Sequence, residues 1–88
     1  MHIRTNIRHL RALHGHSQET LSVMLGTVGF KTVGHWETGR STPVTADLRG
    51  LSLMFRITIH DLVRTDLRRA IPHILAENFE KIELNLNL

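Results

Sequence analysis

Apolar residues recur along most of the chain at intervals of three and four, which places them on one face of an α-helix. This pattern predicts five helices. The first begins near Ile3 and stops at Gly15, the second lies between Ser17 and Gly26, and the third runs roughly over residues 30–38. The fourth starts near residue 45, and the fifth opens at Thr58. A sixth segment begins near residue 72. The residues expected to face inward are Ile3, Ile7, Leu10, Leu13, Leu21, Met24, Leu25, Leu48, Leu51, Phe55, Leu62, Ile74, Leu75, Phe79 and Ile82.

Residues suited to helix ends stand between these stretches. Ser17 is a good N-cap for the second helix, and Gly26 is suited to end it. Thr58 with Asp61 forms a capping box that opens the fifth helix. Pro72 is tolerated only in a first helical turn, so we expect the sixth segment to begin there.

The last seven residues follow a different pattern. Ile82, Leu84, Leu86 and Leu88 are apolar, and the residues between them are polar. A period of two predicts a half-buried β-strand. A lone strand needs a partner for its backbone groups, so we expect two copies of the chain to pair here. A frayed or cut end is the alternative. The residues expected at this dimer contact are Ile74, Leu75, Phe79, Ile82, Leu84, Leu86 and Leu88.

Composition narrows the class of protein. The 88 residues suffice for one small domain, and the absence of Cys excludes disulfides and thiolate metal sites. No apolar run approaches the roughly 20 residues that cross a bilayer, and the first residues lack the apolar region of a signal peptide. We therefore expect a cytoplasmic protein with no membrane partner.

The charges are unevenly distributed. Residues 1–69 carry ten Lys or Arg and five Asp or Glu, a net charge of +5. Residues 70–88 carry one Lys and three Glu, a net charge of −2. A basic body suits a polyanion such as nucleic acid, although a mildly basic surface of no special function is an equal alternative.

Metal binding and catalysis find little support. His9, His14 and His16 cluster in the sequence, but their spacing does not place three imidazoles on one helical face. No phosphate loop, nucleophile elbow or paired-carboxylate motif is present. We therefore expect neither a metal, a cofactor nor an enzyme activity.

Residues 6–43 carry the most specific signal. Ser17-Gln18, Gly26, Val33, Trp36-Glu37 and Gly39 stand at fixed offsets that resemble the helix-turn-helix domain of the lambdoid phage repressors and Cro proteins, the XRE-type family. The resemblance covers about residues 3–67. It implies a five-helix, lambda-repressor-like DNA-binding domain, here residues 1–69. Residues 70–88 would form a dimerisation extension of one helical segment and the short terminal strand.

The resemblance also implies which residues meet DNA. The second helix would contact the DNA backbone through Gln18, and the third would enter the major groove. Arg4 and Arg8 are additional candidates for phosphate contacts. The third helix and its loop would contribute the residues that skip the buried Val33 and Trp36, namely Phe30, Lys31, Thr32, Gly34, His35, Thr38, Arg40, Ser41 and Thr42. Phe30 is equally suited to close the core.

The alignment with the family also gives one structural pair and shows two departures from the family pattern. Arg11 and Glu37 match a pair that is salt-bridged in several family members. The turn before the third helix is one residue longer than usual, with Thr27 as the extra residue. Arg56 stands where the family often has Gly, so it would have to adopt a left-handed conformation.

The resulting expectation is a sequence-specific regulator of transcription that binds double-stranded DNA. It would act as a homodimeric repressor on a palindromic operator, in the cytoplasm of a bacterium or phage host and associated with the nucleoid. The alternative is a protein-interaction module, such as an antitoxin that binds a toxin or another regulator, with or without DNA autoregulation.

Overall fold

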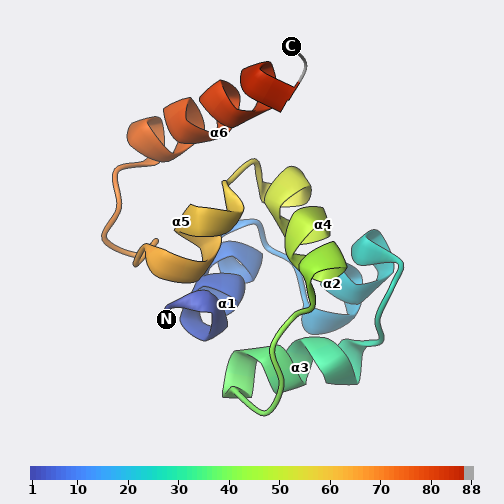
Figure 1. Ribbon diagram of the computed structural model, residues 1–88. Coiled ribbons are helices and arrows are strands. Elements are labelled where there is room, and N and C mark those ends of the chain that lie inside the picture. Colours follow the sequence, from blue (N-terminus) through green and yellow to red (C-terminus); the bar gives the residue numbers. More distant parts are fainter. Residues whose placement is uncertain (87–88) are drawn as a thin grey trace.

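Helices from along the chain pack against one another around a shared apolar core (Figure 1). The computed structural model describes the backbone of residues 1–86 and the side chains of residues 1–82. Within this part the prediction of five helices followed by a sixth helical segment is confirmed. The six helices are α1 (Ile3–Leu13), α2 (Gln18–Leu25), α3 (Phe30–Thr38), α4 (Thr45–Phe55), α5 (Ile59–Arg64) and α6 (Pro72–Leu86).

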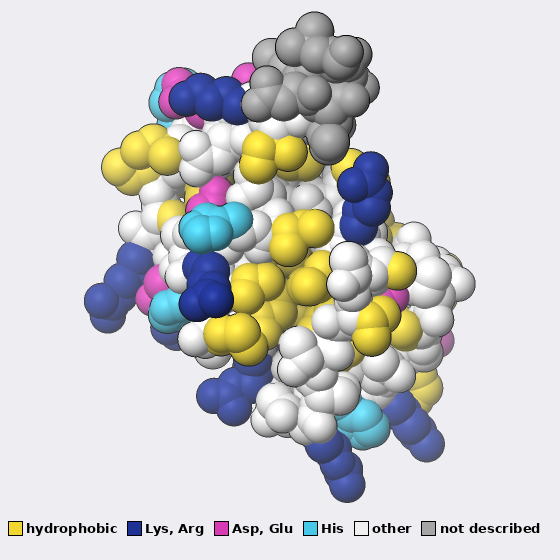
Figure 2. Space-filling view, in the orientation of Figure 1, with side chains coloured by type: hydrophobic (Ala, Val, Ile, Leu, Met, Phe, Trp, Pro, Cys, Tyr) yellow, Lys and Arg dark blue, Asp and Glu magenta, His cyan; other side chains and the backbone are white. Residues whose placement is uncertain are grey.

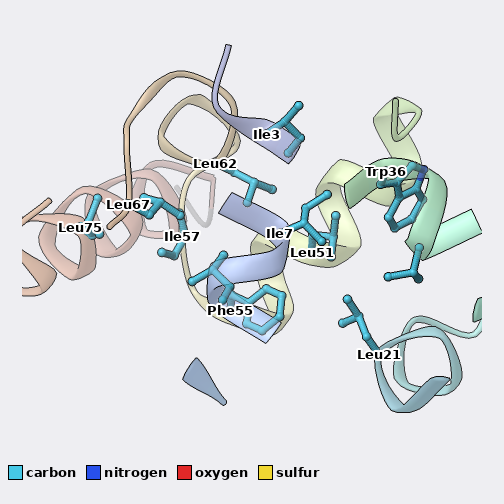
Figure 3. Close-up of a cluster of buried hydrophobic side chains, with 12 residues drawn as sticks. Ile3, Ile7, Leu21, Trp36, Leu51, Phe55, Ile57, Leu62, Leu67 and Leu75 are labelled. Carbon is cyan, nitrogen blue, oxygen red and sulfur yellow. The ribbon is translucent and has the colours of Figure 1, made fainter. Parts of the chain in front are cut away.

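The core draws one or more side chains from every helix (Figure 3). Ile7, Leu21, Val33, Leu51 and Leu62 are completely buried, and they come from α1 to α5 in turn. Each buried aliphatic side chain of this size stabilises the fold by about 1.5–3 kcal/mol. The first five helices are therefore held by the faces that the apolar spacing predicts.

The helix ends follow the sequence signals. Ser17 Oγ accepts the backbone N–H of Thr20 at 3.0 Å, and Thr58 Oγ1 accepts that of Asp61 at 3.0 Å. Gly26 ends α2 in a left-handed conformation, with φ of 73°. Arg56 ends α4 in the same region, with φ of 55°, as its position in the alignment predicts.

The long turn between α2 and α3 is anchored to α4. Thr27 Oγ1 donates to Asp47 Oδ1 at 2.9 Å, and Val28 packs against the core. The extra residue of this turn therefore makes a contact of its own. Nearby, α2 and α4 approach closely, because a methyl group at Gly50 would lie 3.2 Å from a Leu25 methyl carbon.

Helix α6 packs on the body through its described side chains Leu75, Asn78 and Phe79. Leu75 and Phe79 are buried, and Asn78 Nδ2 donates to Asp61 Oδ2 on α5 at 3.0 Å. The Arg56 guanidinium carbon lies 5.2 Å from the centre of the Phe79 ring, a cation–π contact. This first part of α6 therefore belongs to the fold of its own chain.

The predicted terminal strand is wrong over residues 82–86, where α6 continues to Leu86. Residues 87 and 88 lie outside the described part. The apolar residues Ile82 and Leu86 are four residues apart, which also fits a helix. Together with Leu75 and Phe79 they give the spacing 75, 79, 82 and 86, which places all four on one helical face. A helix that is already packed extends by one hydrogen bond per residue, so the helical pattern prevails.

Four apolar side chains expected to face inward are about half exposed or more. Leu13 is 69% exposed, Met24 48%, Ile74 49% and Ile82 45%. Leu13 lies in the last turn of α1, where the helix reaches the surface before Gly15. In residues 1–86, no helix is both long and apolar enough to span a membrane.

Candidate nucleic-acid interface

Helix α3 divides into a buried and an outward face. Val33 and Trp36 are 0% and 2% exposed and join the core. Phe30, Lys31 and Thr38 are exposed and form part of the outward face. Thr38 lies two residues after Trp36. Phe30 is 51% exposed, so the alternative that it closes the core is wrong. Phe30 is the first residue of α3 and directly follows the exposed turn that ends at Gly29.

Two more of the expected groove residues are only half-buried. Thr32 and His35 keep part of their surface open, and Gly34 lies between them in the helix. The Thr38 hydroxyl is 3.1 Å from the Gly34 carbonyl, to which it donates. It keeps its lone pairs to accept a hydrogen bond from outside. The outward face of α3 therefore offers one permanent cation, one imidazole, two hydroxyls and an aromatic ring.

Gln18 begins α2 and lies across α3. Its Nε2 donates to Glu37 Oε1 at 3.3 Å. A methyl group at Gly34 would lie 3.4 Å from Gln18 Oε1, so the amide rests over that glycine. The first turn of α2 and the middle of α3 thus present one continuous surface.

Arg11 braces the same region from α1. Its Nε donates to Glu37 Oε2 at 2.7 Å and its Nη2 to Oε1 at 2.9 Å, while Nη1 reaches the His16 carbonyl at 2.9 Å. The hydrogen bond to Glu37, helped by the charge of that carboxylate, raises the pKa of Arg11 against the opposing effect of burial. The two charges neutralise each other, so Glu37 adds little repulsion for a polyanion.

Basic side chains surround the C-terminal end of α3. Arg40 is exposed in the loop with Ser41 and Thr42, and both Arg40 and Ser41 donate backbone N–H groups to the His35 carbonyl. A methyl group at Gly39 would lie 3.0 Å from Arg4 Nη1, so the Arg4 guanidinium reaches this end from α1. Figure 2 shows Lys or Arg side chains and a His projecting from the side of the molecule where α3 lies.

The helix-turn-helix family matches residues 7–62, almost two thirds of the chain. The chain belongs to the XRE-type helix-turn-helix family. No curated protein and no solved structure matches it. The matched span begins in α1 and ends in α5, so it contains α2 and α3 whole and leaves α6 outside.

Membership in the XRE-type family makes this protein a DNA-binding regulator and gives α2 and α3 their roles as the helix-turn-helix pair. In such a pair the second helix lies in the major groove and the first crosses the DNA backbone. The exposed face of α3 is the one that this arrangement requires. Gln18, at the start of α2, lies where the two helices meet.

The structure brings most of the predicted site residues together and places Arg4 beside them. The expected residues from Gln18 to Thr42 lie on or beside α3, and the Arg11–Glu37 pair lies behind them. The sequence indicated Arg4 only as an additional candidate for phosphate contacts, together with Arg8. Its place beside Gly39 depends on how α1 packs against α3, so no local signal in the sequence identifies it. In the described residues, no group of three or more His, Cys, Asp or Glu is arranged to hold a metal ion.

Proposed function

We propose that this protein is a sequence-specific transcription repressor that binds a palindromic operator as a homodimer. The observation that carries the proposal is the division of α3, with Val33 and Trp36 in the core and Phe30, Lys31 and His35 turned outward. In this proposal the protein acts on a bacterial or phage genome in the cytoplasm and represses by occupying the operator.

The outward residues divide into base contacts and phosphate contacts. Lys31 and His35 can donate to acceptor atoms on base edges, and the Phe30 ring can pack on a thymine methyl group. Arg40 and Arg4, at the end of α3, suit the phosphate backbone, where they fix register but carry no sequence information. With few bidentate side chains on α3, we expect modest specificity from direct base contacts, supplemented by DNA shape.

The residues expected at the dimer contact fall into three groups. Leu75 and Phe79 are buried in their own chain and are unavailable to a second copy. Ile74 and Ile82 are about half exposed, whereas the side chains of Leu84 and Leu86 fall outside the described set and Leu88 lies beyond the described residues. Ile82 lines a hollow of about 150 Å³ together with the half-exposed Leu53 and Ile59.

This apolar surface on α4, α5 and α6 supports a contact between two copies. Two-fold symmetry would place the DNA half-sites about 34 Å apart, one turn of the duplex. We expect Leu53→Glu to lower the dimer affinity in sedimentation equilibrium, and the exposed Val23→Glu on α2 to leave it unchanged. A native protein that stays monomeric at high concentration would contradict the homodimer.

The test of the function is selection from a random pool of duplex DNA. The native protein and the double variant Gln18→Ala/Lys31→Ala would be selected in parallel. Enrichment of a palindrome by the native protein alone would support a sequence-specific regulator that acts through α3. Weak, equal retention by both proteins would contradict the proposal.

A protein-binding role is the second candidate, and one groove favours it. The groove has a volume of about 280 Å³ and lies between the C-terminal ends of α1 and α4 and the start of α6. Apolar side chains form most of its lining, including the 69%-exposed Leu13, and His9, His14 and Arg56 add basic groups. An acidic, apolar segment of a toxin or regulator would suit it.

The two candidates respond differently to substitution. Loss of Lys31, His35 and Arg40 should abolish operator binding but leave a partner in the groove. Leu13→Asp should do the reverse. An autoregulating antitoxin would show both sensitivities, each at its own surface.

A further inference from the structure

The amide of Gln18 has a defined orientation, although it lies at the protein surface. Its Nε2 is 3.3 Å from Glu37 Oε1 and donates to it. Because an ionised carboxylate only accepts hydrogen bonds, this contact determines which end of the amide faces Glu37. The Gln18 oxygen is therefore turned away from Glu37.

Glu37 is itself fixed in place. Its side chain is only 5% exposed, and both of its oxygens accept from Arg11, at 2.7 and 2.9 Å. Such bidentate pairs hold both groups in one geometry. Arg11 is fixed further by the bond from its Nη1 to the His16 carbonyl. The orientation of Gln18 thus depends on two charged residues, one on α1 and one on α3.

Gly34 leaves the space that the Gln18 amide occupies. A methyl group at this position would lie 3.4 Å from Gln18 Oε1, 3.7 Å from Nε2 and 3.8 Å from Cδ. These are ordinary contact distances, so Ala would fit with Gln18 in place. A longer side chain would extend into the volume of the amide. The position therefore requires a small residue, and Gly meets that requirement although it is unfavourable inside a helix.

We infer that Glu37 and Gly34 are positioning residues for Gln18. Glu37, held by Arg11, orients the amide, and Gly34 provides the space in which the amide lies over α3. Gln18 then meets DNA from a fixed place on the surface of the recognition helix. This inference rests on the proposed function, because it concerns the same DNA-binding surface. It assigns Gly34 to Gln18, not to close approach of the DNA.

The first test uses the free protein and needs no DNA. The side-chain amide signals of Gln18 in a ¹⁵N-correlated NMR spectrum would be assigned by their loss in Gln18→Ala. In the native protein and in Gly34→Ala, these protons should show nuclear Overhauser contacts to residue 34 and to Glu37. In Gly34→Leu those contacts should disappear while the rest of the spectrum stays native. Contacts that survive in Gly34→Leu would overturn the inference.

The second test is a double-mutant cycle of DNA affinity on the selected operator. Gly34→Ala, in which the Gln18 amide stays in place, is the reference variant of this cycle. Gly34→Leu should bind about fivefold more weakly, the loss expected when one hydrogen bond is misplaced. In a Gln18→Ala background, changing Gly34 from Ala to Leu should have no further effect.

The outcomes separate this inference from the proposed function. If Gly34→Leu weakens binding equally with and without the Gln18 side chain, Gly34 meets the DNA directly and the positioning role is wrong. If the native protein binds no duplex in the selection, the proposed function fails, and the NMR contacts alone decide whether Glu37 and Gly34 position Gln18. Glu37→Ala should reproduce the loss of the Gln18 contacts seen in Gly34→Leu.

Discussion

Asn6 is a polar residue at the centre of an apolar helix face. It is completely buried on α1, between Ile3 and Ile7. Its Nδ2 donates to the carbonyls of Leu62 and Thr65, at 2.8 and 2.7 Å, and its Oδ1 accepts the N–H of Leu67 at 3.1 Å. One side chain thus satisfies three backbone groups where α5 ends and the chain turns toward α6.

Replacement of Asn6 should therefore be strongly destabilising. Asn6→Ala would remove three buried hydrogen bonds and leave their backbone partners without protein contacts. Each buried group left unsatisfied costs about 1–3 kcal/mol, so we expect a loss of at least 3 kcal/mol in the free energy of unfolding. Urea denaturation would measure it, with the exposed Arg8→Ala on the same helix as a control. A loss below about 1 kcal/mol would show that water replaces the amide.

Among the described side chains of α6, Asn78 makes a polar contact with the body beside the apolar ones. Asp61 on α5 accepts hydrogen bonds from Asn78 at 3.0 Å and from Thr65 at 2.6 Å. Burial alone would raise the pKa of Asp61, but the hydrogen bonds from Thr65, Asn78 and Thr58, with the charge of His60, lower that pKa below its usual value. The docked helix thus favours the ionised carboxylate.

Because the pKa of Asp61 is lowered in the folded state, the free energy of unfolding depends on pH in the acidic range. Because the pKa is lower in the folded state, the stabilisation by Asp61 is complete above its ordinary unfolded value of about 3.9 and is lost as pH falls through the lowered pKa. We expect the native protein to exceed Asp61→Asn in unfolding free energy by a constant amount from pH 5 to 7. The difference should shrink below about pH 4.

Urea titrations between pH 3 and 7 would check this prediction. Glu80→Gln, a change at an exposed carboxylate on α6, is the matched control and should show no such difference. A gap between native and Asp61→Asn that is equal at pH 3 and pH 7 would mean that Asp61 acts through its shape and not through its charge.

The molecule as a whole separates its charges. Arg4, Lys31 and Arg40 gather around α3, while α6, which carries the exposed Glu77 and Glu80, lies at the opposite end of the molecule (Figure 1). A polyanion would be attracted to the first end. This polarity orients the protein on DNA before any base is contacted.

Binding to DNA should weaken steeply with salt, because Lys and Arg contacts release counterions from the phosphates. Arg40→Ala and Arg4→Ala should weaken binding to all duplexes alike and reduce the slope of log affinity against log salt by about one each. Lys31→Ala and His35→Ala should instead change the preferred sequence. Fluorescence anisotropy on matched and scrambled duplexes would distinguish them, and identical behaviour of all four would refute this division.

Much of the fold followed from local pattern. Capping by Ser17 and Thr58 and the approximate bounds of α3 each depend on a residue and its near neighbours. The left-handed conformation of Arg56 was expected from the resemblance to the family. The terminal strand was mispredicted because a period of two over a few residues also fits the i and i+4 positions of a helix. The packing of Leu75 and Phe79 on the body had already formed the first part of α6. The residues from 82 to 86 therefore continued that helix.

The sequence by itself determined the first five helices and the start of the sixth, the caps at Ser17 and Thr58, the family and the face of α3 that remains outward. These features depend on spacing and on the chemistry of neighbouring residues. Only the tertiary structure decided which distant groups meet. It brought Asn6 to the end of α5, Arg4 to the end of α3, Thr27 to Asp47, and Gln18 over Gly34 against Glu37. Such contacts depend on how helices pack in space, which no local periodicity encodes.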